Sequence, residues 1–345
     1  MSEAASAVRA ATPAPVGRVL RIDTGLRIGG DADTLKLAVE LQLPQRISAA
    51  PVLLACMPGG GMNRRYWDLR PDDGDTSYSF AAQMTARGLL VLLVDPVGIG
   101  DSDRPSDGWA LRPEVLADAH HAAIAAVCTG LREGSLVAGL PALPQLQSIG
   151  VGHSLGALLS IVQQARHASH AGIAVLGFGC DGLPDYLVPE ARALIGNTEA
   201  FRMRLPELAR AQFGEPFAII KPSRPSAGLF AAERAEMKGM LALRPAAAPV
   251  LAVGATQAMF PGNVAPEAAS ISVPVFVGVG ELDLVGPAQR IPASFTACHD
   301  LLLHVLPQAG HSHFLFPARH GLYARLAGWA QAFAAAQAAP SSLHS

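Results

Sequence analysis

Six short runs of this sequence consist mainly of apolar residues, and they recur along most of the chain. They are Val52 to Met57, Leu89 to Val94, Leu146 to Val151, Ile173 to Phe178, Val273 to Val279 and Leu301 to Leu306. A strand that is apolar without polar alternation is usually covered on both of its faces, as strands of a parallel sheet are. Each run therefore predicts a buried strand of a largely parallel sheet.

Stretches compatible with helices lie between these runs. They are Ser77 to Ala86, Pro113 to Leu131, Leu155 to Ala168 and Gly321 to Ala336. Alternating strands and helices are typical of βαβ units. Residues 16–43 add two strands, VGRVLRID and TLKLAVELQL, separated by the turn-forming GGDAD. We expect an α/β fold with a mostly parallel, doubly wound sheet of about eight strands and a small antiparallel start.

About 90 residues separate the run that ends near Gly179 from the run that begins near Val273, more than a crossover helix requires. We expect a helical cap or lid inserted between the sixth and seventh strands, with a surface elaboration as the alternative. Its predicted helical pieces are Pro189 to Ala193, Glu207 to Phe213 and Ala231 to Leu243. The predicted division is a catalytic core of residues 16–183 and 271–337, a cap of residues 184–270, and flexible ends of residues 1–15 and 338–345.

Composition excludes several classes of protein. Half of the 345 residues are hydrophobic and only 16% are charged, which excludes a disordered chain. The net charge of −2 predicts neither a nucleic-acid partner nor an anionic membrane partner. No apolar run reaches the ~18 to 20 residues of a spanning helix.

The cysteines and the first residues of the sequence indicate the cellular compartment of the protein. Cys56, Cys128, Cys180 and Cys298 are far apart and lack metal-ligand spacing, which predicts reduced thiols. Because the first residues also lack the apolar core of a secretory signal, we expect a cytoplasmic protein.

Residues 152–156 read GHSLG and match the pattern GxSxG. An apolar run precedes them and a helix-compatible stretch follows, which is the strand, sharp turn and helix of a nucleophile elbow. The two glycines suit a turn in which side chains would collide with the backbone. Ser154 is therefore the predicted nucleophile.

A serine hydroxyl needs a base, and the base needs an orienting carboxylate, here in the chain order Ser, acid, His. His311 follows the run ending at Leu306 and is the predicted base, with His313 as its competitor. Asp283, in GELDLV after the penultimate run, is the predicted acid. Asp181 and Glu281 remain alternatives.

An oxyanion needs backbone donors that are already in place. Leu155, directly after the nucleophile, should supply one amide. The loop CMPGGGMNRR after the run ending at Met57 should supply the other, from Gly60 or Gly61, with Met62 as a further candidate. No GxxxxGK[ST] pattern supports a phosphate-binding loop instead.

At this point the chain resembles the α/β-hydrolase superfamily, in its serine-nucleophile, esterase- and lipase-like branch, over roughly residues 45–335. The resemblance rests on five motifs in the family's order: PGGG at 58–61, DPVGIGDSDRP at 95–105, GHSLG at 152–156, GELD at 280–283 and AGHSHF at 309–314. The second motif looks like a structural loop of the family, so Asp95, Gly98, Gly100 and Asp101 should be architectural. Pro58 departs from the His of the family's common HG pair.

The resemblance implies a serine hydrolase of the carboxylesterase type that forms an acyl-enzyme and requires no cofactor and no metal. The expected partner is a small to medium, largely apolar ester or lactone, while a homodimer is left open. Hydrolysis of a thioester, an amide or a carbon–carbon bond is the main alternative, and a catalytically silent binding protein is a lesser one.

Two groups of side chains are candidates for contact with the substrate. Arg64 and Arg65 lie beside the oxyanion loop. The insertion offers apolar side chains for a pocket roof, although their spacing is equally typical of ordinary packing: Phe201, Met203, Phe213, Phe217, Phe230, Met237, Met240, Met259 and Phe260.

Overall fold

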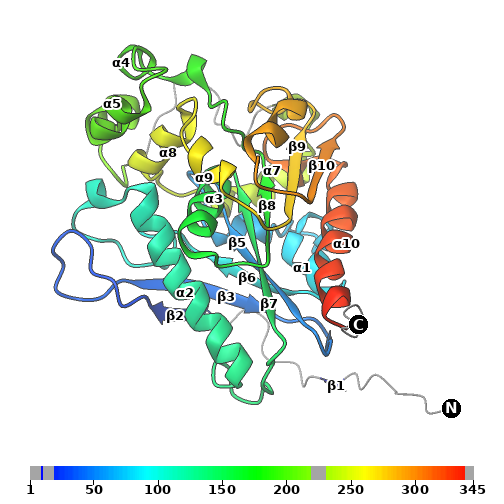
Figure 1. Ribbon diagram of the computed structural model, residues 1–345. Coiled ribbons are helices and arrows are strands. Elements are labelled where there is room, and N and C mark those ends of the chain that lie inside the picture. Colours follow the sequence, from blue (N-terminus) through cyan, green and yellow to red (C-terminus); the bar gives the residue numbers. More distant parts are fainter. Residues whose placement is uncertain (1–8, 11–18, 219–230, 339–345) are drawn as a thin grey trace, which may run out of the picture.

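The computed structural model describes residues 9–10, 19–218 and 231–338. An eight-stranded sheet forms its centre, between two layers of helices (Figure 1). The strands are β2 (Val19–Asp23), β3 (Lys36–Gln42), β5 (Val52–Met57), β6 (Leu90–Val94), β7 (Gln147–His153), β8 (Gly172–Leu176), β9 (Val275–Gly280) and β10 (Leu301–Leu306). Their spatial order is β10-β9-β8-β7-β5-β6-β3-β2.

Only the two pairings that involve β3 are antiparallel, and the other pairings of this sheet are parallel. The predicted mostly parallel sheet of about eight strands with an antiparallel start is thereby confirmed. A separate pair joins β1 (Arg9–Ala10) to β4 (Arg46–Ile47). The predicted flexible ends fall largely on residues 1–8, 11–18 and 339–345, which lie outside the described residues.

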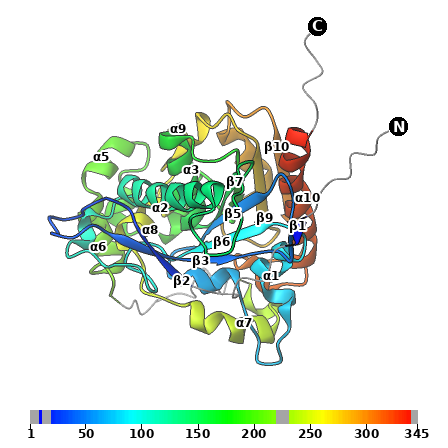
Figure 2. The same cartoon turned by 90° about the horizontal axis from the view of Figure 1, so that it is seen from below.

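Helices cover both faces of the sheet, and Figure 2 shows the two layers from below. α2 (Pro113–Glu133) and α3 (Leu155–His167) pack together on one face, while α1 (Phe80–Thr85) and α10 (Arg319–Ala338) pack on the other. Successive residues of β5 enter different cores, since Leu53 lies in the core under α2 and α3 and Leu54 lies in the core under α1 and α10. Burial on both faces is the physical reason for the unbroken apolar runs.

The helix boundaries follow local capping chemistry. α1 begins later than predicted because the Ser79 side chain accepts a hydrogen bond from the Ala82 amide and so caps the helix at Phe80. α2 begins with Pro113 and ends at Glu133, because the next residue, Gly134, has a φ of 74° in the left-handed region. No helix in the described ranges is both long enough and apolar enough to cross a membrane.

The segment between β8 and β9 contains short helices. They are α4 (Pro189–Arg192), α5 (Thr198–Met203), α6 (Leu205–Phe213), α7 (Met237–Leu243), α8 (Ala252–Met259) and α9 (Ala265–Ala269). The sequence indicates α4, α6 and α7 but not α5, α8 and α9. α8 packs against α3 and α6, and most of its residues are buried. Its sequence therefore lacks the amphipathic pattern from which a helix is predicted.

The apolar residues of this segment have several surroundings. Phe201 and Phe260 stack at 3.8 Å between ring centroids inside a small core of the segment. Met203 and Met237 are 69% and 64% exposed. These four side chains therefore serve the segment's own packing or its surface, and Phe230 lies outside the described residues.

Candidate active site

Ser154 sits in a strained turn between β7 and α3. Its φ of 54° and ψ of −118° are unfavourable for a residue with a side chain, and α3 begins at the next residue. The Ser154 amide donates to the Leu176 carbonyl at 2.8 Å, and the Ser154 carbonyl accepts from the Ala157 amide at 2.9 Å. These bonds hold the strained residue between two strand ends and a helix N-terminus.

The two glycines of GHSLG make this turn sterically feasible. A Cβ atom on Gly152 would lie 2.3 Å from the Gly156 carbonyl oxygen, and one on Gly156 would lie 2.1 Å from the Met57 carbonyl oxygen. Both distances are shorter than any normal contact of a Cβ atom, so neither position can carry a side chain without a shift of the backbone. The absence of a side chain at Gly156 also explains how α3 can approach the end of β5, where the PGGG loop begins.

The structure brings His311 and Asp283 together. The Nδ1 atom of His311 lies 2.7 Å from Oδ1 of Asp283, and both side chains are almost completely buried, at 3% and 0% exposure. A carboxylate only accepts hydrogen bonds, so His311 donates from Nδ1 and is left with Nε2 as its basic atom. The His311 ring lies over the end of β8, since a Cβ on Gly177 would meet its Cε1 atom at 3.2 Å.

The two alternative acids lie elsewhere. Asp181 is 51% exposed at its side chain and pairs with Arg290 at 3.3 Å. Glu281 accepts from both the amide and the side chain of Gln308, at 2.8 and 2.9 Å. Within the described residues, Asp283 is the carboxylate that reaches His311.

His313, the competing base, is bonded to the same carboxylate. Its Nε2 atom lies 3.1 Å from Oδ2 of Asp283, and its side chain is fully buried. Its other nitrogen, Nδ1, is buried without a hydrogen-bond partner among the described residues. With one nitrogen occupied and the other enclosed, His313 has no nitrogen available to a substrate.

His153, the variable residue before the serine in the GxSxG pattern, connects the elbow to the histidine loop, which is residues 307–312 and carries His311. Its Nε2 atom donates to the His311 carbonyl oxygen at 2.8 Å, and its ring centroid is 4.7 Å from that of His311. Tyr66 stacks on the His153 ring, with 4.7 Å between the ring centroids. The sequence did not reveal this role, because the motif places no chemical requirement on that position.

Neither Ser154 Oγ nor His311 Nε2 has a hydrogen-bond partner among the described residues. Hydrogen bonds between a nucleophile and its base are often long or absent until a ligand binds. The fold places Ser154 at the end of β7 and the His311 imidazole over the end of the neighbouring β8. His153, the residue before Ser154, connects the two through its hydrogen bond to the His311 carbonyl oxygen.

Burial and charge act in opposite directions on these groups. Burial alone would raise the pKa of the Asp283 carboxyl, but the charges and hydrogen bonds of His311 and His313 outweigh it and hold that pKa well below its usual value. Burial, followed by the neighbouring His311 and His313, lowers the pKa of His153 well below its usual value. Asp283 is therefore ionised and His153 neutral near neutral pH.

The PGGG loop lies against the elbow. A Cβ on Gly59 would come within 3.2 Å of the Ser154 Cβ, and one on Gly60 would contact the Leu155 side chain at 3.5 Å. In the described part of the chain, the amides of Gly60, Gly61 and Leu155 have no hydrogen-bond acceptor. Gly59 was not singled out from the sequence, although its contact with Ser154 is the tightest of the three glycines.

Residues of the insertion are hydrogen-bonded to the PGGG loop and to Asn63, which follows it. The Ala248 amide donates to the Gly61 carbonyl at 2.9 Å, and the Asn63 amide donates to the Ala246 carbonyl at 2.8 Å. Gly61 has a φ of 76°, which lets the chain turn between Gly60 and this contact. The loop is thus hydrogen-bonded to the insertion on one side and packed on the elbow on the other.

Arg64, a candidate ligand contact from the sequence, is buried in an ion cluster behind the loop. Its guanidinium pairs with Asp95 and, at 2.8 Å, with Asp101. Burial alone would lower the pKa of Arg64, but these two carboxylates raise it, so the guanidinium stays charged. Gly100 leaves room for the Asp95 carboxylate, which a Cβ would meet at 2.2 Å. The 95–105 segment therefore supports the loop structurally, and Arg64 is unavailable to a ligand.

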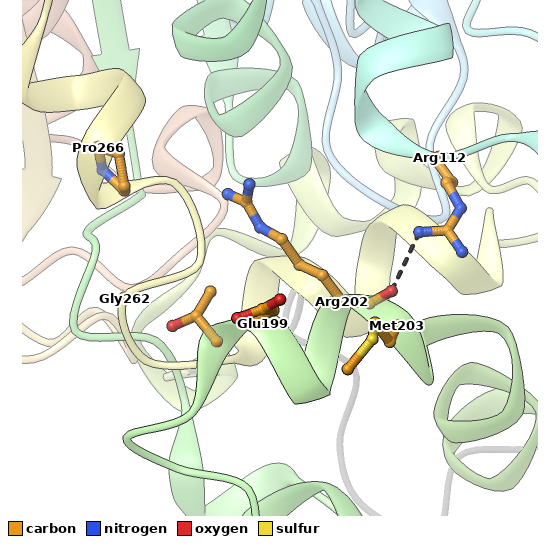
Figure 3. A pocket seen from close by; sticks show the side chains of 7 residues that line it. Arg112, Glu199, Arg202, Met203, Gly262 and Pro266 are labelled. Carbon is orange, nitrogen blue, oxygen red and sulfur yellow. Dashed lines mark hydrogen bonds between the residues drawn. The ribbon is translucent and has the colours of Figure 1, made fainter.

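A surface pocket of about 560 Å³ lies apart from these residues. It is lined by Arg112 and by residues of the insertion, and Figure 3 shows Arg112 bonded to the main chain of Arg202. Ser154, His311 and Asp283 are not among its lining residues. The four cysteines are free thiols. Within the described ranges, no three His, Cys, Asp or Glu side chains are grouped to hold a metal ion.

Solved structures share this fold at low sequence identity. An esterase from Thermogutta terrifontis is 18% identical with a TM-score of 0.53, over 92% of this chain and 99% of that one. An esterase from Exiguobacterium antarcticum is 16% identical with a TM-score of 0.56, over 91% and 100% of the two chains. The proline iminopeptidase of Mycobacterium smegmatis is 19% identical with a TM-score of 0.54, over 93% and 100%.

The TM-scores show a common fold, and they leave the reaction open because esterases and a peptidase share that fold. A search among curated protein sequences found no significant match. The sequence does match the family described as the alpha/beta hydrolase family over residues 52–320, more than half of the chain. With the observed sheet order and the elbow after β7, this match confirms the resemblance drawn from the motifs: the chain belongs to the alpha/beta hydrolase family.

Proposed function

We propose that this protein is a serine hydrolase that cleaves a carboxylic ester or lactone of a small to medium, largely apolar substrate. The observation that supports it most is Ser154 in its strained elbow at the end of β7, together with the His311 imidazole over the end of the neighbouring β8, whose Nδ1 atom is held by a buried carboxylate. In this proposal Ser154 is the nucleophile, His311 the base and Asp283 the orienting acid.

The proposed reaction has two halves. His311 Nε2 takes the proton from Ser154 Oγ while the oxygen attacks the substrate carbonyl, and the resulting imidazolium then protonates the leaving alcohol. Water, deprotonated by the same Nε2 atom, then hydrolyses the acyl-enzyme and frees Ser154. Asp283 stays ionised throughout and stabilises the imidazolium.

The proposed oxyanion hole consists of the Leu155 amide with the amide of Gly60 or Gly61. All three lack an acceptor in the described part of the chain, and the Leu155 amide lies at the N-terminus of α3, where the helix dipole favours negative charge. The side chains beside Gly60 are Leu155 and Val250, which suits an apolar substrate.

We further propose that residues 184–270 act as the cap over this site. Support comes from the hydrogen bonds between residues 245–248 and the PGGG loop, and from Val250 beside Gly60. In this arrangement the insertion shapes the substrate pocket, while the core supplies the reacting groups.

The test is turnover of a short-chain p-nitrophenyl ester together with labelling by a fluorophosphonate. Ser154→Ala should lose both, with a fall in kcat of about 10⁴- to 10⁶-fold. Ser270→Ala, at an exposed serine of the insertion, is the matched control and should leave both unchanged. A wild-type protein that neither turns over the ester nor becomes labelled at Ser154 would contradict the nucleophile assignment.

The choice of bond is tested with a panel. A lactone, an aryl thioester and an amino-acid p-nitroanilide should be compared with the ester by kcat/KM. The proposal expects the ester or lactone to be preferred, whereas preference for the thioester or anilide would replace the ester assignment while keeping the same three residues.

A further inference from the structure

The buried carboxylate of Asp283 has two imidazole partners. Oδ1 accepts from His311 Nδ1 at 2.7 Å, and Oδ2 accepts from His313 Nε2 at 3.1 Å. The Asp283 side chain has no exposed surface. In the described ranges, these two imidazoles are the only hydrogen-bond donors to it.

The two imidazoles donate from opposite ends of their rings. His311 uses Nδ1 and keeps Nε2 for the proposed proton transfer. His313 uses Nε2, and its Nδ1 is buried without a partner among the described residues. The chemistry of the two rings therefore differs: His311 can exchange a proton with a substrate, whereas His313 can only hold the carboxylate.

Packing keeps the His313 ring in this orientation. His313 is the first residue of the short helix η9 (His313–Leu315), and its ring stands edge-on to His153, with centroids 5.5 Å apart and planes at 84°. The next residue, Phe314, is wedged among Tyr66, Trp67 and Phe80 at 5.0 to 5.5 Å between centroids. The packing of Phe314 therefore anchors the backbone that carries His313, and His153 lies against the His313 ring itself.

An unpaired carboxylate oxygen in such surroundings would be costly. A buried acceptor without a donor costs about 1–3 kcal/mol, and more when it is charged. Without a donor on Oδ2, the carboxylate would gain by rotating toward another donor or by admitting water. Rotation would move Oδ1 away from His311 Nδ1, and water would hold the carboxylate less rigidly than the packed His313 ring does.

We propose that His313 is a positioning residue for the hydrolase reaction: its Nε2–H holds Oδ2 of Asp283 and thereby keeps Oδ1 directed at His311. This inference rests on the proposed function, because the reaction assigned to Ser154 and His311 is what the positioning serves. It goes beyond that function by assigning a role to a fourth side chain that does not contact the substrate.

The central test compares His313→Leu with His313→Gln. Leucine removes the donor at similar volume, whereas glutamine keeps a side-chain N–H group of comparable reach. With the p-nitrophenyl ester, His313→Leu should lower kcat about 10- to 100-fold, the effect of one hydrogen bond to a charged group. KM should stay unchanged because His313 is fully buried, and His313→Gln should recover most of kcat.

A double-mutant cycle separates positioning from general damage. If His313 acts through Asp283, adding His313→Leu to Asp283→Asn should lower kcat no further than Asp283→Asn alone. Equal and additive losses in the two backgrounds would overturn the inference, as would a wild-type kcat in His313→Leu.

A readout independent of turnover is the proton NMR signal of His311 Nδ1–H. An imidazole proton shared with a buried carboxylate resonates far downfield, so the wild type and His313→Gln should keep this signal, and His313→Leu should shift or lose it. An unchanged signal in His313→Leu would overturn the inference.

Failure of the proposed function looks different from failure of this inference. A wild type that is neither active nor labelled would remove the reaction, and the NMR comparison alone would then decide whether His313 holds Asp283. If His313→Leu does not fold, as judged by thermal unfolding, His313→Met takes its place in all three measurements.

Discussion

At the scale of single residues, the Asp283 carboxylate determines how the His311 ring lies. Its 2.7 Å bond to Nδ1 selects the tautomer that leaves Nε2 basic. Its position after a strand predicts Asp283 as the acid, but the same reasoning does not exclude Asp181, which also follows a strand. The distinction is one of distance, because Asp181 is turned toward Arg290 and solvent.

Asp283→Asn should lower kcat on the order of 10⁴-fold, because the amide can donate to His311 Nδ1 and so favour the wrong tautomer. The control is Asp181→Asn, which should retain wild-type turnover because Asp181 is half-exposed and its carboxylate pairs with Arg290 and not with His311. Steady-state kinetics with the p-nitrophenyl ester give both values. A loss of less than about tenfold in Asp283→Asn, or an equal loss in the two variants, would contradict the assignment.

At the scale of elements, the strand–turn–helix unit of β7 and α3 is the best-determined part of the site. Local signals specified it fully: an apolar run, two glycines around a serine, and a helix-forming stretch. The structure adds that α3 reaches the end of β5 only because position 156 has no side chain. The elbow and the PGGG loop are therefore packed as one unit.

Gly156→Ala should destabilise the protein by at least about 3 kcal/mol, because its Cβ would stand 2.1 Å from the Met57 carbonyl oxygen, and rigid backbone surrounds it. Gly328→Ala is the matched control: it lies in α10 with nothing within 4 Å of its Cβ and should stabilise the protein by about 0.5–1 kcal/mol. Urea unfolding measures both changes. Similar stabilities for the two variants would show that α3 can shift away from β5.

At the scale of the whole molecule, buried neutral histidines make stability depend on pH. Burial lowers the pKa of His120 from 6.5 to about 4 and that of His170 from 6.5 to about 3. Because these groups stay neutral in the folded protein, the unfolded chain binds more protons below about pH 6.5. Their contribution to stability is therefore complete above that pH and declines as the pH falls toward their folded pKa values.

The free energy of unfolding should fall by about 2 kcal/mol between pH 6 and pH 5 from these two residues. His120→Leu should roughly halve this fall, because the His120 ring is buried with both nitrogens unpartnered in the described structure and leucine does not titrate. Urea titrations at pH 7, 6 and 5 measure the slope, within a range where most carboxylates stay ionised. An identical slope in the variant would mean that His120 takes up its proton while folded.

The strands were predictable almost to the residue, and the insertion was not. The sheet is covered on both faces, so its central strands such as β5, β6 and β9 appear in the sequence as unbroken apolar runs. Helices such as α8 are surrounded by other elements and carry no polar face, so their periodicity is lost. The surroundings of Arg64 were not predictable either. Its position beside the PGGG loop suggests contact with a ligand, but the Asp95 carboxylate that pairs with its guanidinium lies 31 residues further along the chain.

The sequence by itself determined the fold class, the order of the strands' apolar runs, the elbow around Ser154 and the identity of the family. These features depend on residue types at short spacing, which local sterics and burial impose directly. Only the tertiary structure decided that Asp283 holds His311, that His153 connects the elbow to the histidine loop, and that His313 occupies the second carboxylate oxygen. Those contacts join residues that are far apart in the chain or that compete for one partner, and only packing determines which side chains meet.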